Sequence, residues 1–219
     1  MQSAKLFKLV LVLSIVVVVL LSGCATVTVN TKVNKDGTID SRKMVINMSS
    51  YIYGLLTESA KKKGYSSLRE AFLSNVSEDM RDKVTYDEIW SGDQVSIIVE
   101  ARDFVPKDNA KIKIWKEGNY LIYEDLTFMS KKEQPTDEFS NVILSSFSLH
   151  YYLEMPGKIV DSNANVVKDN KAEWHLTGAD AFNARIYAKS EIPSIPGFEL
   201  LIGVLGLVAA FGITIRLRK

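Results

Sequence analysis

The sequence has almost no cysteine. Cys24 is the only one among 219 residues. A single thiol excludes an internal disulfide and any zinc cluster built from several cysteines, so the folded part must be stabilised by packing alone. Once the two apolar ends are set aside, the remaining length favours one domain that can bury its own core.

An excess of charge of either sign is also missing. The chain has 27 Lys and Arg against 26 Asp and Glu. Five of the basic residues but only one of the acidic residues lie in the terminal segments, so residues 25–197 are slightly acidic. No strongly basic field is available to hold a phosphate backbone, and we therefore expect no nucleic-acid partner.

Residues that carry chemistry are scarce. The two histidines, His150 and His175, each lie among aromatic or apolar neighbours in an expected strand. This setting is typical of a structural histidine, and a shared site would require the two strands to place them together. No Gly-rich phosphate loop, His-x-x-x-His pair or nucleophile elbow is present. We expect no enzymatic activity, no catalytic residue, no cofactor and no metal ion.

Acidic side chains gather loosely in one segment, but basic side chains alternate with them. This pattern is typical of a solvated surface, and a calcium site is the alternative interpretation. The acidic members are Asp79, Asp82, Asp87 and Glu88, and the basic ones are Arg81 and Lys83.

The N-terminus has the order of a secretory signal. Lys5 and Lys8 precede an apolar run from Leu9 to Leu21, and small residues follow it. The stretch from Leu21 to Cys24 resembles the lipobox of lipoproteins, which implies that a signal peptidase removes residues 1–23 and that the thiol of Cys24 carries a lipid. An uncleaved signal anchor with an incidental cysteine is the alternative.

The C-terminus repeats this apolar character. Residues 200–215 carry no charge and are followed at once by RLRK. As a helix they would extend roughly 24 Å, close to the thickness of a membrane core. The basic residues at both ends predict a cytoplasmic C-terminus before any processing, with the domain between them outside the cell membrane. Residues 191–197 contain two prolines and form a stiff spacer.

Pro196, Gly197 and Phe198 open this tail. The triplet, followed by an apolar helix and a basic end, resembles the PGF-CTERM sorting signal of archaeal surface proteins. The resemblance implies that an archaeosortase removes residues 198–219 and that the mature protein receives a lipid anchor. A retained transmembrane helix is the alternative.

The pattern of apolar residues, turns and helix caps over residues 24–190 predicts an α+β ectodomain with a mostly antiparallel sheet of about seven to nine strands and two helices inserted after the first hairpin. Residues 25–33 alternate between apolar and polar side chains, a turn follows, and residues 38–48 return as a hairpin. Ser49 or Ser50 can cap a helix that Gly64 ends, and Ser67 with Glu70 forms a capping box for a second helix. Strands are expected from residue 84 onward, including 141–155, 171–176 and 182–189.

The order of segments in the ectodomain resembles the LppM-like lipoprotein domain. Its members show an apolar strand ending in a Pro-Gly turn, an Asn-containing loop, a Trp-bearing strand and a closing strand before a membrane segment. The resemblance implies a lipid or glycolipid ligand in an apolar cavity. The matching residues are Pro156, Gly157, Asn163, Trp174 and Leu176.

Aromatic side chains could line such a cavity, because their rings hold apolar tails while offering a polar edge. Core packing is the alternative role for them, and a structural or interaction module of the envelope with a solid core is the alternative function. An envelope hydrolase would require a histidine beside a carboxylate in a cleft. The candidate cavity aromatics are Tyr51, Trp90, Trp115, Tyr151 and Trp174.

Two N-glycosylation sequons, at Asn47 and Asn75, fit an extracellular location. The expected partners are therefore membrane lipid, a lipid or glycolipid ligand, a signal peptidase and an archaeosortase.

The lipobox resemblance predicts that Cys24→Ser abolishes lipid labelling of the mature N-terminus, because serine offers no thiol for the lipid. Metabolic labelling with a radioactive lipid precursor measures this directly, and an unchanged signal would refute the assignment. The mass of the mature C-terminus separates a cleaved tail from a retained one.

Overall fold

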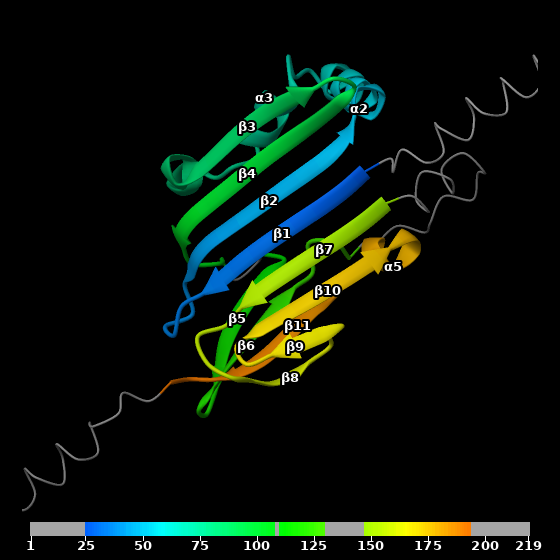
Figure 1. Ribbon diagram of the computed structural model, residues 1–219. Coiled ribbons are helices and arrows are strands. Elements are labelled where there is room, and N and C mark those ends of the chain that lie inside the picture. The colour runs from blue at the N-terminus through cyan, green and yellow to red at the C-terminus, as the bar shows by residue number, and fades with distance from the viewer. Residues whose placement is uncertain (1–24, 108–109, 130–146, 194–219) are drawn as a thin grey trace, which may run out of the picture.

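The computed structural model describes residues 25–107, 110–129 and 147–193. Seven strands form the larger sheet in the order β3-β4-β2-β1-β7-β10-β9 (Figure 1). These strands are β1 (Ala25–Val33), β2 (Ile39–Ser49), β3 (Val84–Ser91), β4 (Gln94–Phe104), β7 (Phe147–Glu154), β9 (Val166–Lys168) and β10 (Lys171–Thr177). Four strands form the smaller sheet in the order β5-β6-β11-β8, namely β5 (Ile112–Glu117), β6 (Tyr120–Asp125), β8 (Ile159–Ser162) and β11 (Ile186–Glu191).

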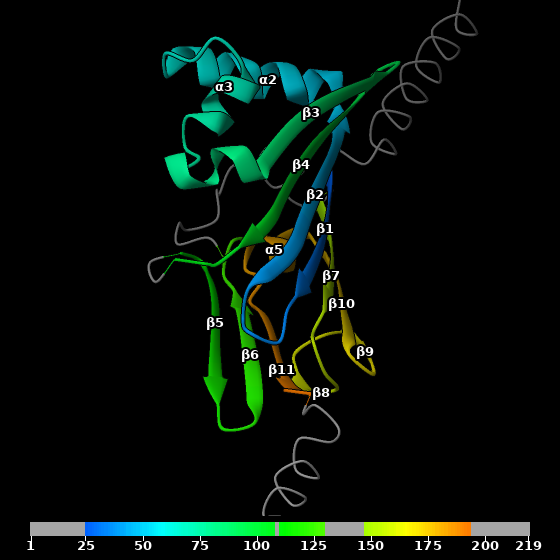
Figure 2. The same cartoon turned by 90° about the vertical axis from the view of Figure 1, so that its left-hand side faces the viewer.

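Two layers cover one face of the larger sheet. Figure 2 shows the helices α2 (Ser50–Lys62) and α3 (Leu68–Leu73) on the same side as the smaller sheet. The helices and the 3-10 helix η1 (Glu78–Lys83) lie over β2, β4 and β3, whereas the smaller sheet lies over β1, β7 and β10. A short helix α5 (Gly178–Phe182) follows β10. Among the helices of the described residues, none has the length and apolar character needed to cross a membrane.

The two expected helices and their capping serines are confirmed, but the expected capping box is only half formed, because the Glu70 carboxylate accepts from the amide of Ser66 and not from that of Ser67. The Ser49 hydroxyl accepts a hydrogen bond from the amide of Ile52 at 3.4 Å, and the Ser67 hydroxyl accepts one from the amide of Glu70 at 3.1 Å. Both bonds satisfy amides that a helix start leaves without a partner. Gly64, with φ of 90°, follows the last turn of α2 in the left-handed conformation that glycine adopts without strain.

The expected α+β class is confirmed, but the arrangement differs from the expectation in four ways. The strands form two sheets rather than one, and β1 pairs with β7 in parallel, starting from Ala25 opposite Phe147. β8 and β9 were not expected. Phe182, assigned to the last strand, lies in α5, where its ring packs 4.4 Å from that of Phe147, and the closing strand begins at Ile186. Of the strand expected over 141–155, the first six residues lie outside the described residues.

The interior between the two sheets contains a charged pair. Arg42 of β2 and Asp125 of β6 approach to 2.8 Å, with side chains 11% and 0% exposed. Arg42 also donates to the hydroxyl oxygens of Tyr151 at 2.7 Å, Tyr123 at 3.1 Å and Thr31 at 3.2 Å. The Tyr151 hydroxyl in turn donates to Asp125 at 3.0 Å. One network thus joins both sheets.

Burial raises the pKa of both tyrosines in this network. Desolvation raises the pKa of Tyr123 to about 12, although the nearby Arg42 acts in the opposite direction. Desolvation raises the pKa of Tyr151 well above its ordinary value. Both hydroxyls are protonated at neutral pH, as an ordinary tyrosine is, and can each donate one hydrogen bond.

Asp125→Ala should lower the free energy of unfolding by about 3–5 kcal/mol, because it leaves the Arg42 guanidinium buried without its counter-charge. Chemical denaturation of the full chain in detergent measures the loss. The control Asp40→Ala breaks an exposed pair with Lys32 and should leave stability close to that of the native chain. Equal stability of the two variants would contradict this role for the buried pair.

The Pro-Gly turn after β7 also contributes to stability, because the backbone approaches Gly157 closely. A Cβ at Gly157 would collide with the carbonyl oxygen of Glu191 and approach the Pro193 Cδ to 3.2 Å. Gly157→Ala should therefore lower the free energy of unfolding by about 1–3 kcal/mol. Gly54→Ala is the matched control, since nothing lies within 4 Å of a Cβ there and alanine favours the helix. A Gly157→Ala variant that is as stable as this control would contradict the close approach.

Candidate functional site

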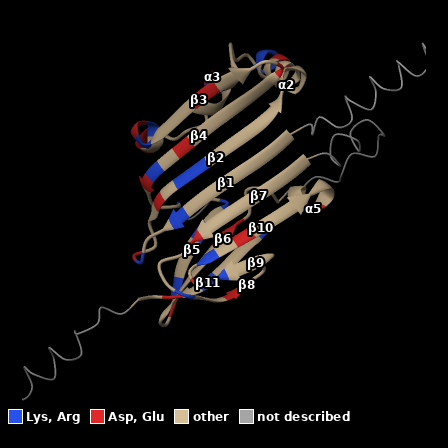
Figure 3. Cartoon of the chain, viewed as in Figure 1, with Lys and Arg blue, Asp and Glu red and all other residues tan. Residues whose placement is uncertain are grey.

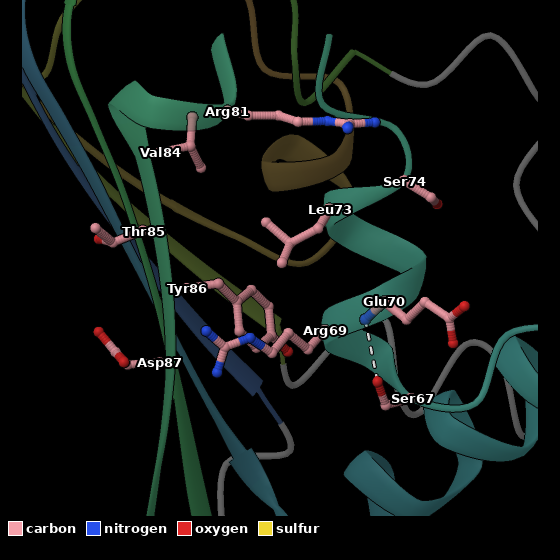
Figure 4. A pocket seen from close by; sticks show the side chains of 10 residues that line it. All are labelled: Ser67, Arg69, Glu70, Leu73, Ser74, Arg81, Val84, Thr85, Tyr86 and Asp87. Atoms are coloured by element: carbon pink, nitrogen blue, oxygen red, sulfur yellow. Dashed lines mark hydrogen bonds between the residues drawn. The ribbon is translucent and has the colours of Figure 1, made fainter. Parts of the chain in front are cut away.

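A hollow lies between α3, η1 and the edge strand β3, with a volume of about 780 Å³ (Figure 4). Its lining combines the arginines Arg69 and Arg81 with Leu73 and Tyr86. The Arg69 guanidinium lies 6.0 Å from the centre of the Tyr86 ring, so this cation is held over the floor of the hollow. The volume falls within the range of roughly 300–1,000 Å³ that is usual for ligand pockets.

Hydrogen bonds fix the floor of this hollow. Tyr86 is buried, and its hydroxyl donates to Glu88 at 2.8 Å. Tyr53 of α2 donates to the other oxygen of the same carboxylate at 2.8 Å, and its ring contacts Trp90 edge-on at 4.8 Å. Desolvation raises the pKa of Tyr86, which keeps its hydroxyl a donor. The sheet edge and α2 are thereby held together.

Acidic side chains in the lining have other partners or lie at the margin. Glu70 accepts hydrogen bonds from the hydroxyl and the backbone amide of Ser66, and these bonds lower its pKa. Figure 4 shows the Glu70 carboxylate on the far side of α3 from β3, while Arg69 extends toward Tyr86. Of the charged side chains that line the hollow, Arg69 is the one held over the Tyr86 ring, a position suited to contact with an anionic group.

A second hollow, of about 360 Å³, lies where the chain passes from the larger sheet to the smaller one. Its lining is mainly apolar, and Val105, with 67% of its surface exposed, stands at its opening. Lys107 lies at the rim and forms a 2.8 Å ion pair with Asp79. The apolar lining residues are Met80, Phe104, Val105, Pro106, Ala110 and Ile112.

η1 contributes to both hollows. Arg81 lines the first hollow and Met80 lines the second. A hollow with two arginines and two carboxylates, Glu70 and Asp87, in its lining and a mainly apolar hollow therefore share one short helix. This is the arrangement that an amphiphile with an anionic head and a hydrocarbon tail requires.

A third hollow, of about 480 Å³, lies on the uncovered face of the larger sheet. Charged side chains of both signs line it, including Lys43, Glu100 and Glu173. Figure 3 shows that charges on this sheet gather toward the C-terminal end of β1, whereas the end that carries Ala25 is almost uncharged. The mixed charges make this hollow a poor match for an apolar chain.

The structure places the five candidate aromatics in different surroundings. Tyr151 and Trp174 are buried in the core with their rings 5.7 Å apart. Tyr51 and Trp90 are 65% and 54% exposed. Trp115 is partly exposed on β5 and donates to Glu117. None of the five lines any of the three hollows above.

The other candidate positions are surface positions or fall outside the described residues. Asn47, on the uncovered face of β2, accepts a hydrogen bond from Ser96 at 2.6 Å, and Asn75 is exposed after α3. Cys24 and the tail residues Pro196, Gly197 and Phe198 lie outside the described residues. Within the described ranges, no group of three or more His, Cys, Asp or Glu side chains is placed to hold a metal ion.

Sequence reasoning did not find the two hollows beside η1. Arg81 was expected on a solvated surface, and no pattern singled out Arg69. The apolar lining combines residues from η1 with residues around Pro106, which lie apart in the sequence. The one available signal was Phe104-Val105-Pro106, where proline ends a strand directly after two large apolar residues. An apolar strand end of this kind, which no following strand residue covers, indicates an apolar surface.

The fold and its hollows define an α+β domain of two packed sheets with one face partly covered by helices. No family model matches the chain. The chain is 67% identical over 203 residues to an uncharacterized protein of Archaeoglobus fulgidus, covering 92% of this chain and 93% of that protein. The chain belongs to the same family as this archaeal protein.

Among solved structures, the described fold is similar to the NMR structure of the folded domain of the Mycobacterium tuberculosis LppM protein. The TM-score is 0.46 and the sequence identity is 12%, over 78% of this chain and 91% of that one.

Proposed function

We propose that this protein is a non-enzymatic lipoprotein of the cell surface, anchored in the membrane, whose domain binds a lipid or glycolipid at the hollows beside η1. The observation that carries the proposal is the shared wall of these hollows. Arg81 lines the hollow that also contains Arg69, and Met80 of the same helix lines the apolar one. A lipid with an anionic head could place its head near Arg69 and its tail against Val105.

Membrane anchoring is supported by the edge of the domain that follows Cys24. Ala25 pairs with Met48, so the start of β1 lies beside the start of α2. The turn between β3 and β4 lies at the same edge, because the amide of Ser50 donates to the carbonyl of Asp93. The exposed rings of Tyr51 and Trp90 belong to this edge, and such rings are enriched where protein meets the membrane interface.

The charge distribution supports the same orientation. Figure 3 shows little charge on the larger sheet near Ala25. Lys61 and Lys62, at the end of α2, are exposed and could contact anionic head groups. A lipid on Cys24 would hold this edge against the membrane and keep the hollows beside η1 within reach of lipids.

The alternative function is an envelope interaction module with a solid core. It is favoured by the space between the two sheets, where Tyr123, Tyr151 and Trp174 are fully or almost fully buried. The lipid-binding proposal therefore depends on open surface hollows and not on a cavity enclosed by the sheets.

Val105→Asp should weaken lipid binding at least about tenfold, because a carboxylate at the opening of an apolar hollow must lose water when an acyl chain enters. Native mass spectrometry of the full chain, released from detergent micelles that contain phosphatidylglycerol, measures the bound lipid. Arg69→Gln should reduce binding of this anionic lipid more than binding of a neutral one.

Val166→Asp is the matched control, since Val166 is exposed on β9 and lines none of the three hollows. It should bind lipid as the native chain does. If the native chain retains no lipid, or if both aspartate variants lose it equally, the lipid-binding proposal fails and the interaction module is favoured.

A further inference from the structure

The two histidines of the chain meet on the uncovered face of the larger sheet. His150 of β7 lies directly opposite His175 of β10 in the antiparallel register. Their Nδ1 atoms are 3.0 Å apart, and their ring centres are 5.3 Å apart. The placement that a shared histidine site requires is therefore present in the fold. Both side chains are partly or fully exposed, so an ion from solvent can reach them.

Neighbouring groups orient the ring of His175. The Oε2 atom of Glu173 lies 3.3 Å from its Nε2 atom, and the ring of Tyr152 packs against it edge-on at 5.9 Å. When Nε2 donates its proton to this carboxylate, the lone pair of Nδ1 is directed toward His150. A carboxylate on the far nitrogen of an imidazole is the usual support of a metal-binding histidine.

The backbone at this position is also fixed. The amide of His175 donates to the Asn165 side chain at 2.7 Å, and β7 is paired on both sides, with β1 and with β10. Thr28 of β1 is the cross-strand neighbour of His150 on the other side and carries no charge. The two imidazoles are thus presented by paired strands, which position a site more precisely than loops do.

The separation of the two nitrogens suits one metal ion. With bonds of about 2.0–2.1 Å, two nitrogen ligands of one ion stand roughly 2.9 Å apart at a right angle and roughly 3.3 Å apart in a tetrahedron. The observed 3.0 Å lies between these values. Ring rotation is enough to direct both lone pairs at a common ion, because the ring torsion of histidine is broad.

We propose that His150 and His175 bind a divalent transition-metal ion such as Zn²⁺ or Ni²⁺ through their Nδ1 atoms, with Glu173 as a positioning residue and water completing the coordination. Imidazole suits these ions, whereas Mg²⁺ and Ca²⁺ prefer oxygen ligands. The bound ion would link β7 to β10, and neither histidine lines the hollows beside η1. The site does not depend on the proposed lipid binding.

Isothermal titration of the untagged full chain in detergent with ZnCl₂ tests this site. Every titration uses the Cys24→Ser background, because it removes the one thiol that could bind zinc. We expect one ion per chain, and a loss of that binding of at least about tenfold in both His150→Gln and His175→Gln. Unchanged binding in these variants would overturn the proposal, as would no binding below millimolar zinc, which would mean that the histidines form a hydrogen-bonded pair only.

A matched pair of carboxylate variants tests the role of Glu173. Glu173→Gln should weaken zinc binding by about tenfold while one ion per chain is retained. Glu154→Gln, on the same face and paired with Lys171, should not change it. Equal effects of the two variants would remove Glu173 from the site.

Histidine NMR signals of the native chain give a readout that does not depend on any variant folding. Addition of ZnCl₂ should shift the imidazole signals of both residues together and displace the ring proton between their Nδ1 atoms. MgCl₂ at the same concentration should leave them unchanged. Signals that do not respond to zinc would contradict the proposal.

Discussion

The buried pair of Arg42 and Asp125 is the interaction on which the two-sheet arrangement depends. A guanidinium and a carboxylate lose their water when the sheets close, and their contact with Tyr123, Tyr151 and Thr31 offsets this loss only in one relative placement of β2 and β6. A shift of either sheet would leave a charge buried without a partner. We infer that the pair fixes where the smaller sheet lies, and that this position leaves β2, β4 and β3 to be covered by the helices. The hollows beside η1 lie on this helix-covered side of the larger sheet.

Local features of this fold could be predicted from the sequence, and long-range pairing could not. The alternation around Val27 and Val29 marks the inward face of β1, and the hydroxyls of Ser49 and Ser67 mark helix starts, because each of these signals lies within a few residues. The parallel pairing of β1 with β7 joins segments about 120 residues apart, and alternation reports only the face of a strand and not its neighbour. Phe182 had the spacing of a strand residue, but it ends the short helix α5, where its ring packs against that of Phe147.

The same limit explains the candidate site. Arg42 lies on the same face of β2 as Met44, Ile46 and Met48. An arginine on an apolar face was therefore a signal of a buried ion pair. Its partner Asp125 could not be identified, since the pairing requires two sheets to be brought together. The aromatics expected around a cavity were chosen by residue type. The structure separates them because burial is decided by the side of the strand on which each ring stands, and Tyr151 and Trp174 point into the core.

The positions of the two ends constrain how the domain can be held. β1 begins at the edge that follows Cys24, whereas β11 ends beside the turn between β5 and β6, where the amide of Ile192 donates to the carbonyl of Asn119 (Figure 1). β1 alone extends roughly 27 Å between these edges. The chain from Pro193 to Phe198 reaches roughly 18 Å when fully extended. A lipid on Cys24 and a retained tail in the same membrane would therefore oblige the strands to lie along the membrane surface. Removal of the tail would free the far end, and the domain could then stand on the edge that carries Tyr51 and Trp90. If both ends are anchored as we propose, processing of the tail would decide which face of the domain meets lipid.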